Sequence, residues 1–116
     1  MLSEERDFGA RMFAALASAA RLHILERLSE GPSSVKELSE ATDLKQSMTS
    51  QHLAVLLSAG VVVCTAEGNL RIYSLRGPRI ARILELVEEF YNVHLEGLRR
   101  VVARHFERTL SSARMD

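Results

Sequence analysis

The chain has 116 residues, of which 47% are hydrophobic and 26% charged, and its formal net charge is zero. This length corresponds to a single domain, 1–116, and the apolar content predicts a folded chain. No apolar run approaches the roughly 18 residues that a membrane span requires. The N-terminus is charged and lacks an apolar signal core, and the single cysteine, Cys64, cannot form an intrachain disulfide. We therefore expect a cytoplasmic protein without a membrane partner.

Two helices are predicted at the start of the chain, over about 4–17 and about 19–29. Apolar residues recur at helical spacing in both segments, and Gly31-Pro32-Ser33 ends the pattern. A capping box, Ser34-Val35-Lys36-Glu37, then begins a short third helix that ends near Thr42. The first helix carries apolar residues along one face, so it is a candidate for contact with a second chain.

The tight turn Asp43-Leu44-Lys45 leads into a fourth helix over about 46–59. Its apolar positions predict that Met48, Leu53 and either Leu56 or Leu57 face the core. Gly60 follows at the position where a left-handed residue commonly ends a helix. The third and fourth helices with their short turn predict a helix-turn-helix over about 34–59.

Beyond Gly60 the pattern changes from helical to strand-like. The β-branched run at 61–65, the turn signal Glu67-Gly68-Asn69 and the alternating segment 70–75 predict a β-hairpin. Pro78 suits the first position of a last helix, expected over about 78–110, which would be about 50 Å long. The expected fold is thus mainly α with a small hairpin over about 61–75, a winged helix-turn-helix that is dimeric through its first and last helices.

The charge distribution and the fourth helix point to double-stranded DNA as a partner. Residues 41–80 carry four basic and two acidic side chains, whereas the flanking segments are acidic or balanced. The second helix of a helix-turn-helix fits the major groove, and here its segment has no acidic residue. Its predicted outward side chains form hydrogen bonds and are suited to contact base edges and phosphates. These candidate DNA contacts are Lys45, Gln46, Ser47, Thr49, Ser50, Gln51 and His52, with Arg71 from the wing.

Several segments resemble the ArsR/SmtB family of bacterial repressors. The resemblance lies in LASAARLHIL at 16–25, QSMTSQHLAVL at 46–56 and EGNLRIYSL at 67–75, and it extends over about residues 8–110. It implies a homodimer, joined by the first and last helices, that represses transcription until an effector binds. Two departures stand out: Lys45 replaces the usual Ser or Thr at the N-cap of the recognition helix, and the wing turn is less basic, which leaves Arg71 as its main phosphate contact.

The resemblance also points to two places where family members bind metals. At the Cys-x-Cys place this chain has Ser34 and Lys36, which excludes a thiolate site for arsenite, cadmium or lead. On the last helix, Asn92 and His94 precede His105 at the family's spacing, but the outer ligands are replaced. The two histidines lie on one helix face about 16 Å apart, too far to share one ion within a chain. A divalent ion (Zn, Ni or Co) would have to bind between subunits through His94, His105 and, tentatively, Asn92.

Other interpretations of the same residues remain open. The two histidines can instead make polar contacts within a dimer seam, with a non-metal effector or none. A winged helix can also serve as a protein-interaction module, although the polar outward face of the fourth helix favours DNA. An enzyme is not expected, because the sequence has no nucleophile–base pair, no phosphate-cradling glycine loop and no clustered carboxylates on one short element.

Overall fold

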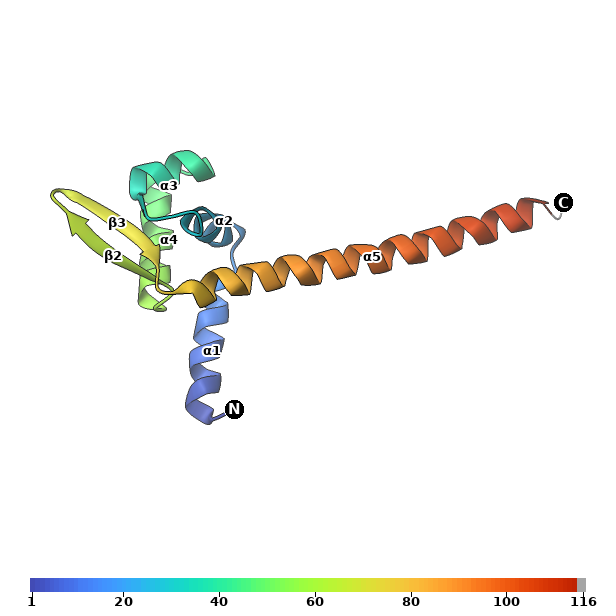
Figure 1. Cartoon of the computed structure of the whole chain (residues 1–116), viewed down its shortest axis with the longest axis horizontal. Helices are drawn as coiled ribbons and strands as arrows, with labels where there is room; N and C mark the ends of the chain where they lie inside the picture. Colours follow the sequence, from blue (N-terminus) through green and yellow to red (C-terminus); the bar gives the residue numbers. More distant parts are fainter. Residues whose placement is uncertain (115–116) are drawn as a thin grey trace. The chain divides into compact units, whose positions relative to one another are not determined.

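The computed structural model describes residues 1–114 and contains five α-helices and three β-strands within that part of the chain. Its contacts divide the chain into two units, Met1–Leu84 and the residues from Glu85 onward, which are described separately. The first unit contains α1 (Ser3–Leu16), α2 (Ala19–Leu28), β1 (Ser33–Ser34), α3 (Val35–Thr42), α4 (Gln46–Ser58), β2 (Val62–Glu67) and β3 (Leu70–Leu75), with the start of α5 (Pro78–Arg114). Figure 1 labels all of these elements except β1, with colours that follow the chain from blue to red. The fold class is confirmed. The expectation of a single domain over the whole chain stays a prediction.

The helix boundaries have local causes. Ser18 caps α2 by accepting a hydrogen bond from the Arg21 amide, and Ser34 and Glu37 form the expected reciprocal capping box at α3. Helix α3 ends at Asp43, whose backbone is left-handed with φ of 56°. At the end of α4 the amides of Gly60 and Val61 bond back to the carbonyls of Leu57 and Leu56, and Gly60 has φ of 73°. This pair of bonds is the Schellman motif, which explains why glycine occupies that position.

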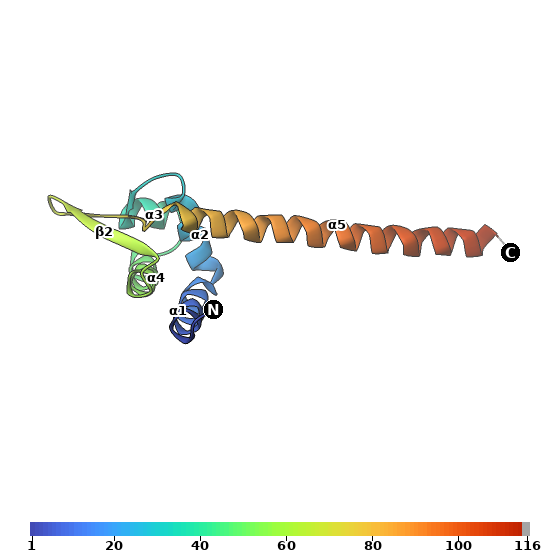
Figure 2. The same cartoon turned by 60° about the horizontal axis from the view of Figure 1, so that its bottom comes forward.

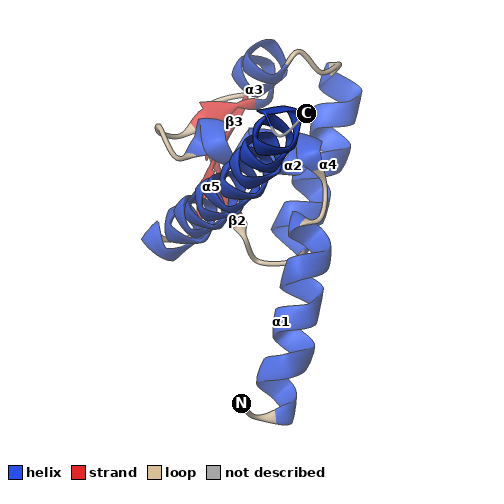
Figure 3. Ribbon diagram, turned by 90° about the vertical axis from the view of Figure 1, so that its right-hand side faces the viewer, coloured by secondary structure: helices blue, strands red, loops and turns tan. Residues whose placement is uncertain are grey.

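The three strands form one antiparallel sheet in the order β1-β3-β2. Glu67 and Leu70 pair across a two-residue turn at Gly68 and Asn69, so β2 and β3 make the predicted hairpin. Figure 3 shows β3 beside α3, and in Figure 2 the hairpin extends past α4 to a free tip. The short strand β1 pairs Ser33 with Tyr73 and was not predicted, because the sequence placed Ser33 in the break after the second helix.

One hydrophobic core holds the first unit together. It draws on α1, α2, α3, α4, the sheet and the start of α5. Its members are Leu16, Ile24, Leu25, Leu28, Leu38, Leu53, Leu56, Val61, Val62, Tyr73 and Leu84. Helix α3 contacts both α2 and α4, so the helix-turn-helix is anchored from two sides. Burial of these aliphatic side chains, each worth about 1.5–3 kcal/mol, dominates the stability of the unit and fixes the orientation of α4.

Candidate nucleic-acid interface

Helix α4 presents a polar surface beside the hairpin. Lys45, Gln46, Ser47, Ser50 and Gln51 are all exposed, as the sequence predicts for groups that contact DNA. The helix has no acidic side chain among Gln46–Ser58. Its exposed face therefore carries hydrogen-bonding groups without the negative charge that would repel a polyanion.

Two neighbouring side chains of α4 lie on the faces opposite to those predicted. Thr49 is fully buried rather than outward, and Met48 is 44% exposed rather than in the core. The inward face of α4 runs through Thr49, Leu53 and Leu56, at helical spacing i, i+4 and i+7. The Thr49 hydroxyl donates to the carbonyl of Lys45 at 3.0 Å, which satisfies the group within the core. The predicted outward position of Thr49 is therefore wrong, because its side chain lies in the core, and Met48 occupies a place on the exposed surface.

Lys45 and His52 flank this surface in different ways. Lys45 is the N-cap residue of α4 and makes no side-chain capping bond, as its side chain has no acceptor to offer. Its exposed ammonium group is free to approach a phosphate. His52 is half-buried, and its Nδ1 lies 3.4 Å from Nη1 of Arg21 on α2. The histidine thus lies at the edge of the outward surface rather than at its centre.

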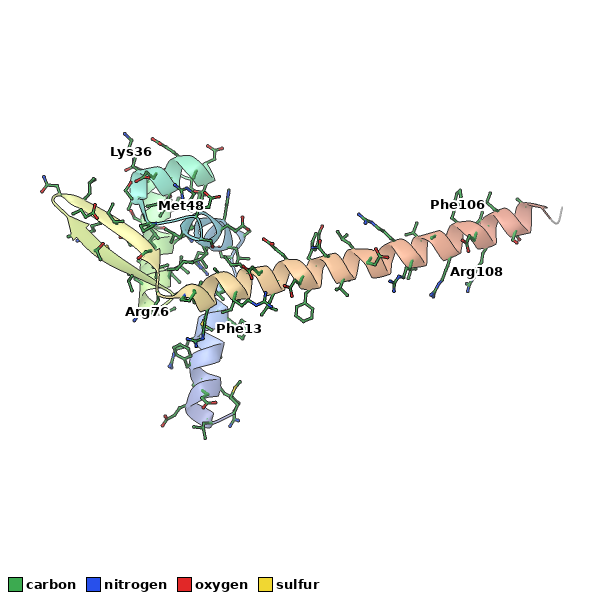
Figure 4. The ribbon with its side chains drawn as sticks, viewed as in Figure 1. Phe13, Lys36, Met48, Arg76, Phe106 and Arg108 are labelled. Atoms are coloured by element: carbon green, nitrogen blue, oxygen red, sulfur yellow. The ribbon has the colours of Figure 1, made fainter. Side chains whose placement is uncertain are left out.

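A cleft of about 300 Å³ separates the starts of α3 and α4 from the hairpin. Its lining consists of Ser34, Val35, Lys36, Gln46, Asn69, Leu70 and Arg71. Two cations, Lys36 from α3 and Arg71 from β3, thus share one depression with the first residue of α4. Figure 4 shows the Lys36 side chain extending outward from the start of α3. An anionic backbone running between the recognition helix and the wing would contact both charges.

The sequence alone did not single out Lys36 as a candidate contact residue. In the sequence it stands out only as the residue that replaces a metal-binding cysteine, because nothing local shows that the first turn of α3 lies next to the hairpin. The pairing of β1 with β3, through Ser34 and Ile72, brings the two together. The one signal in the sequence is that Lys36 lies within two residues of the Ser33-Ser34 segment. That position points to the hairpin only once the pairing of β1 with β3 is known.

Tyr73 connects the hairpin to the core. It is 6% exposed, and it lies opposite Cys64 in the β2–β3 pairing. Burial raises the pKa of the Tyr73 hydroxyl above its ordinary value, Cys64 raises it further, and Arg71 acts in the opposite direction. Arg71 and Tyr73 are two residues apart on the same face of β3, so the packed tyrosine supports the strand from which Arg71 projects.

Helix α5 carries the three residues considered as metal ligands. Asn92, His94 and His105 are all exposed within their unit. In residues 1–114 of one chain, no cluster of three or more His, Cys, Asp or Glu side chains is arranged to hold a metal ion.

The comparisons with known proteins agree with this arrangement. The family model described as bacterial regulatory protein, arsR family, matches residues 18–63, which include α2, α3 and α4. The transcriptional regulator Rv0081 of Mycobacterium tuberculosis is 44% identical over 81 residues, covering 69% of this chain and 71% of that protein. The chain belongs to the ArsR family. It is a DNA-binding transcriptional regulator and not an enzyme, and the protein-interaction alternative is set aside.

Two further relatives extend the comparison. The transcriptional repressor SmtB of M. tuberculosis is 35% identical over 78 residues, covering 67% of this chain and 58% of that protein. A solution structure from Mycobacterium bovis, Mb0332, is a homodimeric winged helix-turn-helix DNA-binding domain. It superposes with a TM-score of 0.76 at 34% identity, covering 82% of this chain and 88% of that one. Within residues 1–114 of this ArsR-family chain, no helix combines the length and apolarity needed to cross a bilayer.

Proposed function

We propose that this ArsR-family protein binds operator DNA as a homodimer and represses transcription until an effector releases it. The observation that carries the proposal is the acid-free outward face of α4 beside the Lys36–Arg71 cleft. A helix of this polarity fits the major groove, and the two cations are placed for the flanking phosphates. Because its target is bacterial DNA, the proposed place of action is the cytoplasm.

Exposed apolar side chains on α1 and on α5 support a homodimer. On α1, Phe8 and Phe13 are 53% and 65% exposed, and on α5 Phe90 and Val101 are 76% and 60% exposed. Each unit, taken by itself, leaves these large apolar side chains in water, which is unusual for a protein without a partner. The related Mb0332 domain is homodimeric. Two recognition helices in one dimer would read two half-sites of a palindromic operator about one helical turn apart.

Selection from bacterial genomic DNA followed by fluorescence anisotropy tests the DNA part of the proposal. We expect enrichment of a palindromic site, with binding that weakens steeply as salt increases because counterions are released from neutralised phosphates. Transcription in vitro from a promoter that contains the selected site tests the direction of regulation. Loss of transcript supports repression, whereas activation, or failure to enrich any site, contradicts it.

For the effector, we propose a divalent ion (Zn, Ni or Co) between the α5 helices of two subunits. His94 and His105 lie on one face of α5 at a spacing that allows His94 of one protomer to meet His105 of its partner in an antiparallel pair. Imidazole suits all three metals, and the Asn92 amide oxygen or water would complete the coordination. A bound ion would favour one relative orientation of the α5 helices, with a coupling of about 1–3 kcal/mol to DNA binding.

Calorimetric titration with each of the three metals separates this proposal from a non-metal effector. We expect wild-type protein to bind at least one of these metals near neutral pH through its imidazole nitrogens. The variants His94→Ala and His105→Ala should each lose most of the heat that metal binding releases or absorbs in the wild type. Equal binding by all three proteins would contradict the site, and the histidines would then be polar groups of the dimer seam.

A further inference from the structure

The side chain of Arg21 connects three helices of the first unit. Its backbone amide is held by the Ser18 cap at the start of α2. From there the guanidinium donates through Nε to the carbonyl of Ala15 at 2.5 Å and through Nη2 to the carbonyl of Ala14 at 3.4 Å. Both acceptors belong to the last turn of α1, where carbonyl groups lack the usual α-helical partners, and the Ala14 carbonyl also accepts from the Ala17 amide at 3.3 Å. The remaining nitrogen, Nη1, lies 3.4 Å from Nδ1 of His52 on α4.

The chemistry of this last contact determines the state of His52. A guanidinium has donors only, so Nδ1 of His52 must be the acceptor. An imidazole that accepts at Nδ1 is neutral and carries its proton on Nε2. The Arg21 contact is the one hydrogen bond that the His52 ring makes in the described part of the chain, so Nε2–H has no intramolecular acceptor. The half-buried ring therefore offers a single N–H donor at the edge of the recognition surface.

We propose that Arg21 is a positioning residue for DNA recognition, which fixes His52 as an Nε2–H donor toward an acceptor atom of DNA. Guanine N7 and O6, thymine O4 and phosphate oxygens are acceptors of the required kind. The same guanidinium holds the end of α1, so it ties the recognition helix to a helix that we assign to the dimer. This inference rests on the proposed function, and it adds a residue of α2 to the machinery that reads the operator.

Two properties distinguish positioning from a simple cap on α1. If Arg21 were only a cap on α1, it would stabilise the fold whatever residue stood at position 52. Its removal would then leave the tautomer of His52 unchanged. Positioning predicts that the tautomer of His52 depends on Arg21. It also predicts that a side chain with an acceptor and a donor in similar places can replace the histidine. Glutamine meets that requirement, since its carbonyl oxygen can accept from Arg21 while its amide nitrogen donates to DNA.

The first experiment needs no DNA. Long-range ¹H–¹⁵N NMR spectra of the full chain at pH 8 report which ring nitrogen of each histidine is protonated. We expect His52 to be in the Nε2–H form in the wild type and a mixture of tautomers in Arg21→Met, which keeps the aliphatic stem and removes every donor. His23 on α2 serves as the internal reference. A wild-type His52 protonated on Nδ1, or an unchanged His52 tautomer in Arg21→Met, would overturn the proposal.

The second experiment uses operator binding by anisotropy. We expect His52→Ala to weaken binding about 3- to 12-fold, the range for loss of one hydrogen bond, and His52→Gln to stay within about 2-fold of wild type. In Arg21→Met, His52→Ala should have little further effect. Two results would contradict positioning: losses of DNA affinity that add up when Arg21→Met and His52→Ala are combined, or equal losses of affinity for His52→Gln and His52→Ala. If Arg21→Met does not fold, the comparison of the two His52 variants decides. Wild-type protein that binds no operator refutes the proposed function instead, and the NMR result is unaffected.

Discussion

Thr49 and Ser50 are adjacent in α4 and face opposite environments. The Thr49 side chain is fully buried with its hydroxyl bonded to the Lys45 carbonyl, while Ser50 is exposed on the polar surface. A hydroxyl inside the core contributes to stability, and one on the surface is available to DNA. The two residues therefore provide a matched test of which side of α4 reads the operator.

We expect Thr49→Val to change stability but not recognition. Valine keeps the shape and loses one hydrogen bond, so the free energy of unfolding should fall by about 1 kcal/mol or less. Ser50→Ala should leave stability nearly unchanged and alter which operator sequence is preferred, as should Gln46→Ala. Urea denaturation and anisotropy on a panel of operator variants measure the two effects. A Thr49→Val variant with altered sequence preference would contradict the burial of that side chain.

Lys36 and Arg71 are expected to contribute to affinity rather than to sequence preference. Each Lys36→Ala or Arg71→Ala change removes one cation from the cleft beside the wing. We expect weaker binding to all sequences alike and a salt dependence flatter by about 0.9 in slope for each phosphate that is no longer neutralised. Arg27→Ala, which removes a cation of α2 paired with Glu30, is the control. An unchanged salt slope in Lys36→Ala would remove that residue from the interface.

At the scale of the element, the hairpin depends on the packing of Tyr73. Its side chain is buried and lies opposite Cys64, and burial raises the pKa of its hydroxyl above the ordinary value. A pKa that is higher in the folded than in the unfolded chain means that the neutral tyrosine is favoured by folding. The resulting stability is fully present below the ordinary tyrosine pKa of about 10 and is lost as the pH rises through the folded-state value.

We therefore predict an alkaline loss of stability that Tyr73→Phe reduces. Denaturation in urea from about pH 8 to about pH 11 should show the wild-type free energy of unfolding falling above about pH 10, and the variant falling less steeply. Tyr91→Phe changes an exposed tyrosine of α5 and should follow the wild type. Identical pH profiles for wild type and Tyr73→Phe would show that the buried hydroxyl does not titrate with unfolding.

At the scale of the whole molecule, α5 extends over 37 residues, from Pro78 to Arg114. Beyond Leu84, most of its large apolar side chains are exposed within their unit. In Figure 4, Phe106 and Arg108 leave opposite sides of the helix. In proteins, a helix gains most of its stability from tertiary packing of its apolar face rather than from its own backbone. We therefore expect the apolar face of α5 to pack against a partner surface, which the proposed homodimer would supply.

Val101→Glu should dissociate that dimer. An unpaired carboxylate in an apolar seam is costly, and we expect dimer affinity to fall on the order of 100-fold, about 3 kcal/mol. Ala103→Glu places the same charge on the opposite face of α5 and should leave the dimer intact. Sedimentation velocity at micromolar concentration measures both. A wild-type protein that sediments as a stable monomer of 13.0 kDa would contradict the homodimer.

Much of the fold follows from signals that act over a few residues. The Ser34–Glu37 capping box, Gly60 after α4 and the turn before Leu70 each satisfy backbone groups within one turn of the chain, so the sequence alone predicts α3, the end of α4 and β3. The polar character of α4 and its lack of acidic residues are also properties of the sequence. These features suffice to predict a winged helix-turn-helix and a candidate DNA-binding face on α4.

Only the tertiary structure decided which side chains meet across the fold. Thr49 rather than Met48 is buried because the inward face of α4 is set by packing against α2 and α3, and side-chain polarity alone predicts the reverse. Lys36 joins the cleft because β1 pairs with β3, and Arg21 reaches His52 across 31 residues of sequence. Such pairings depend on loop closure and on the shape of a shared core, which local propensity does not encode.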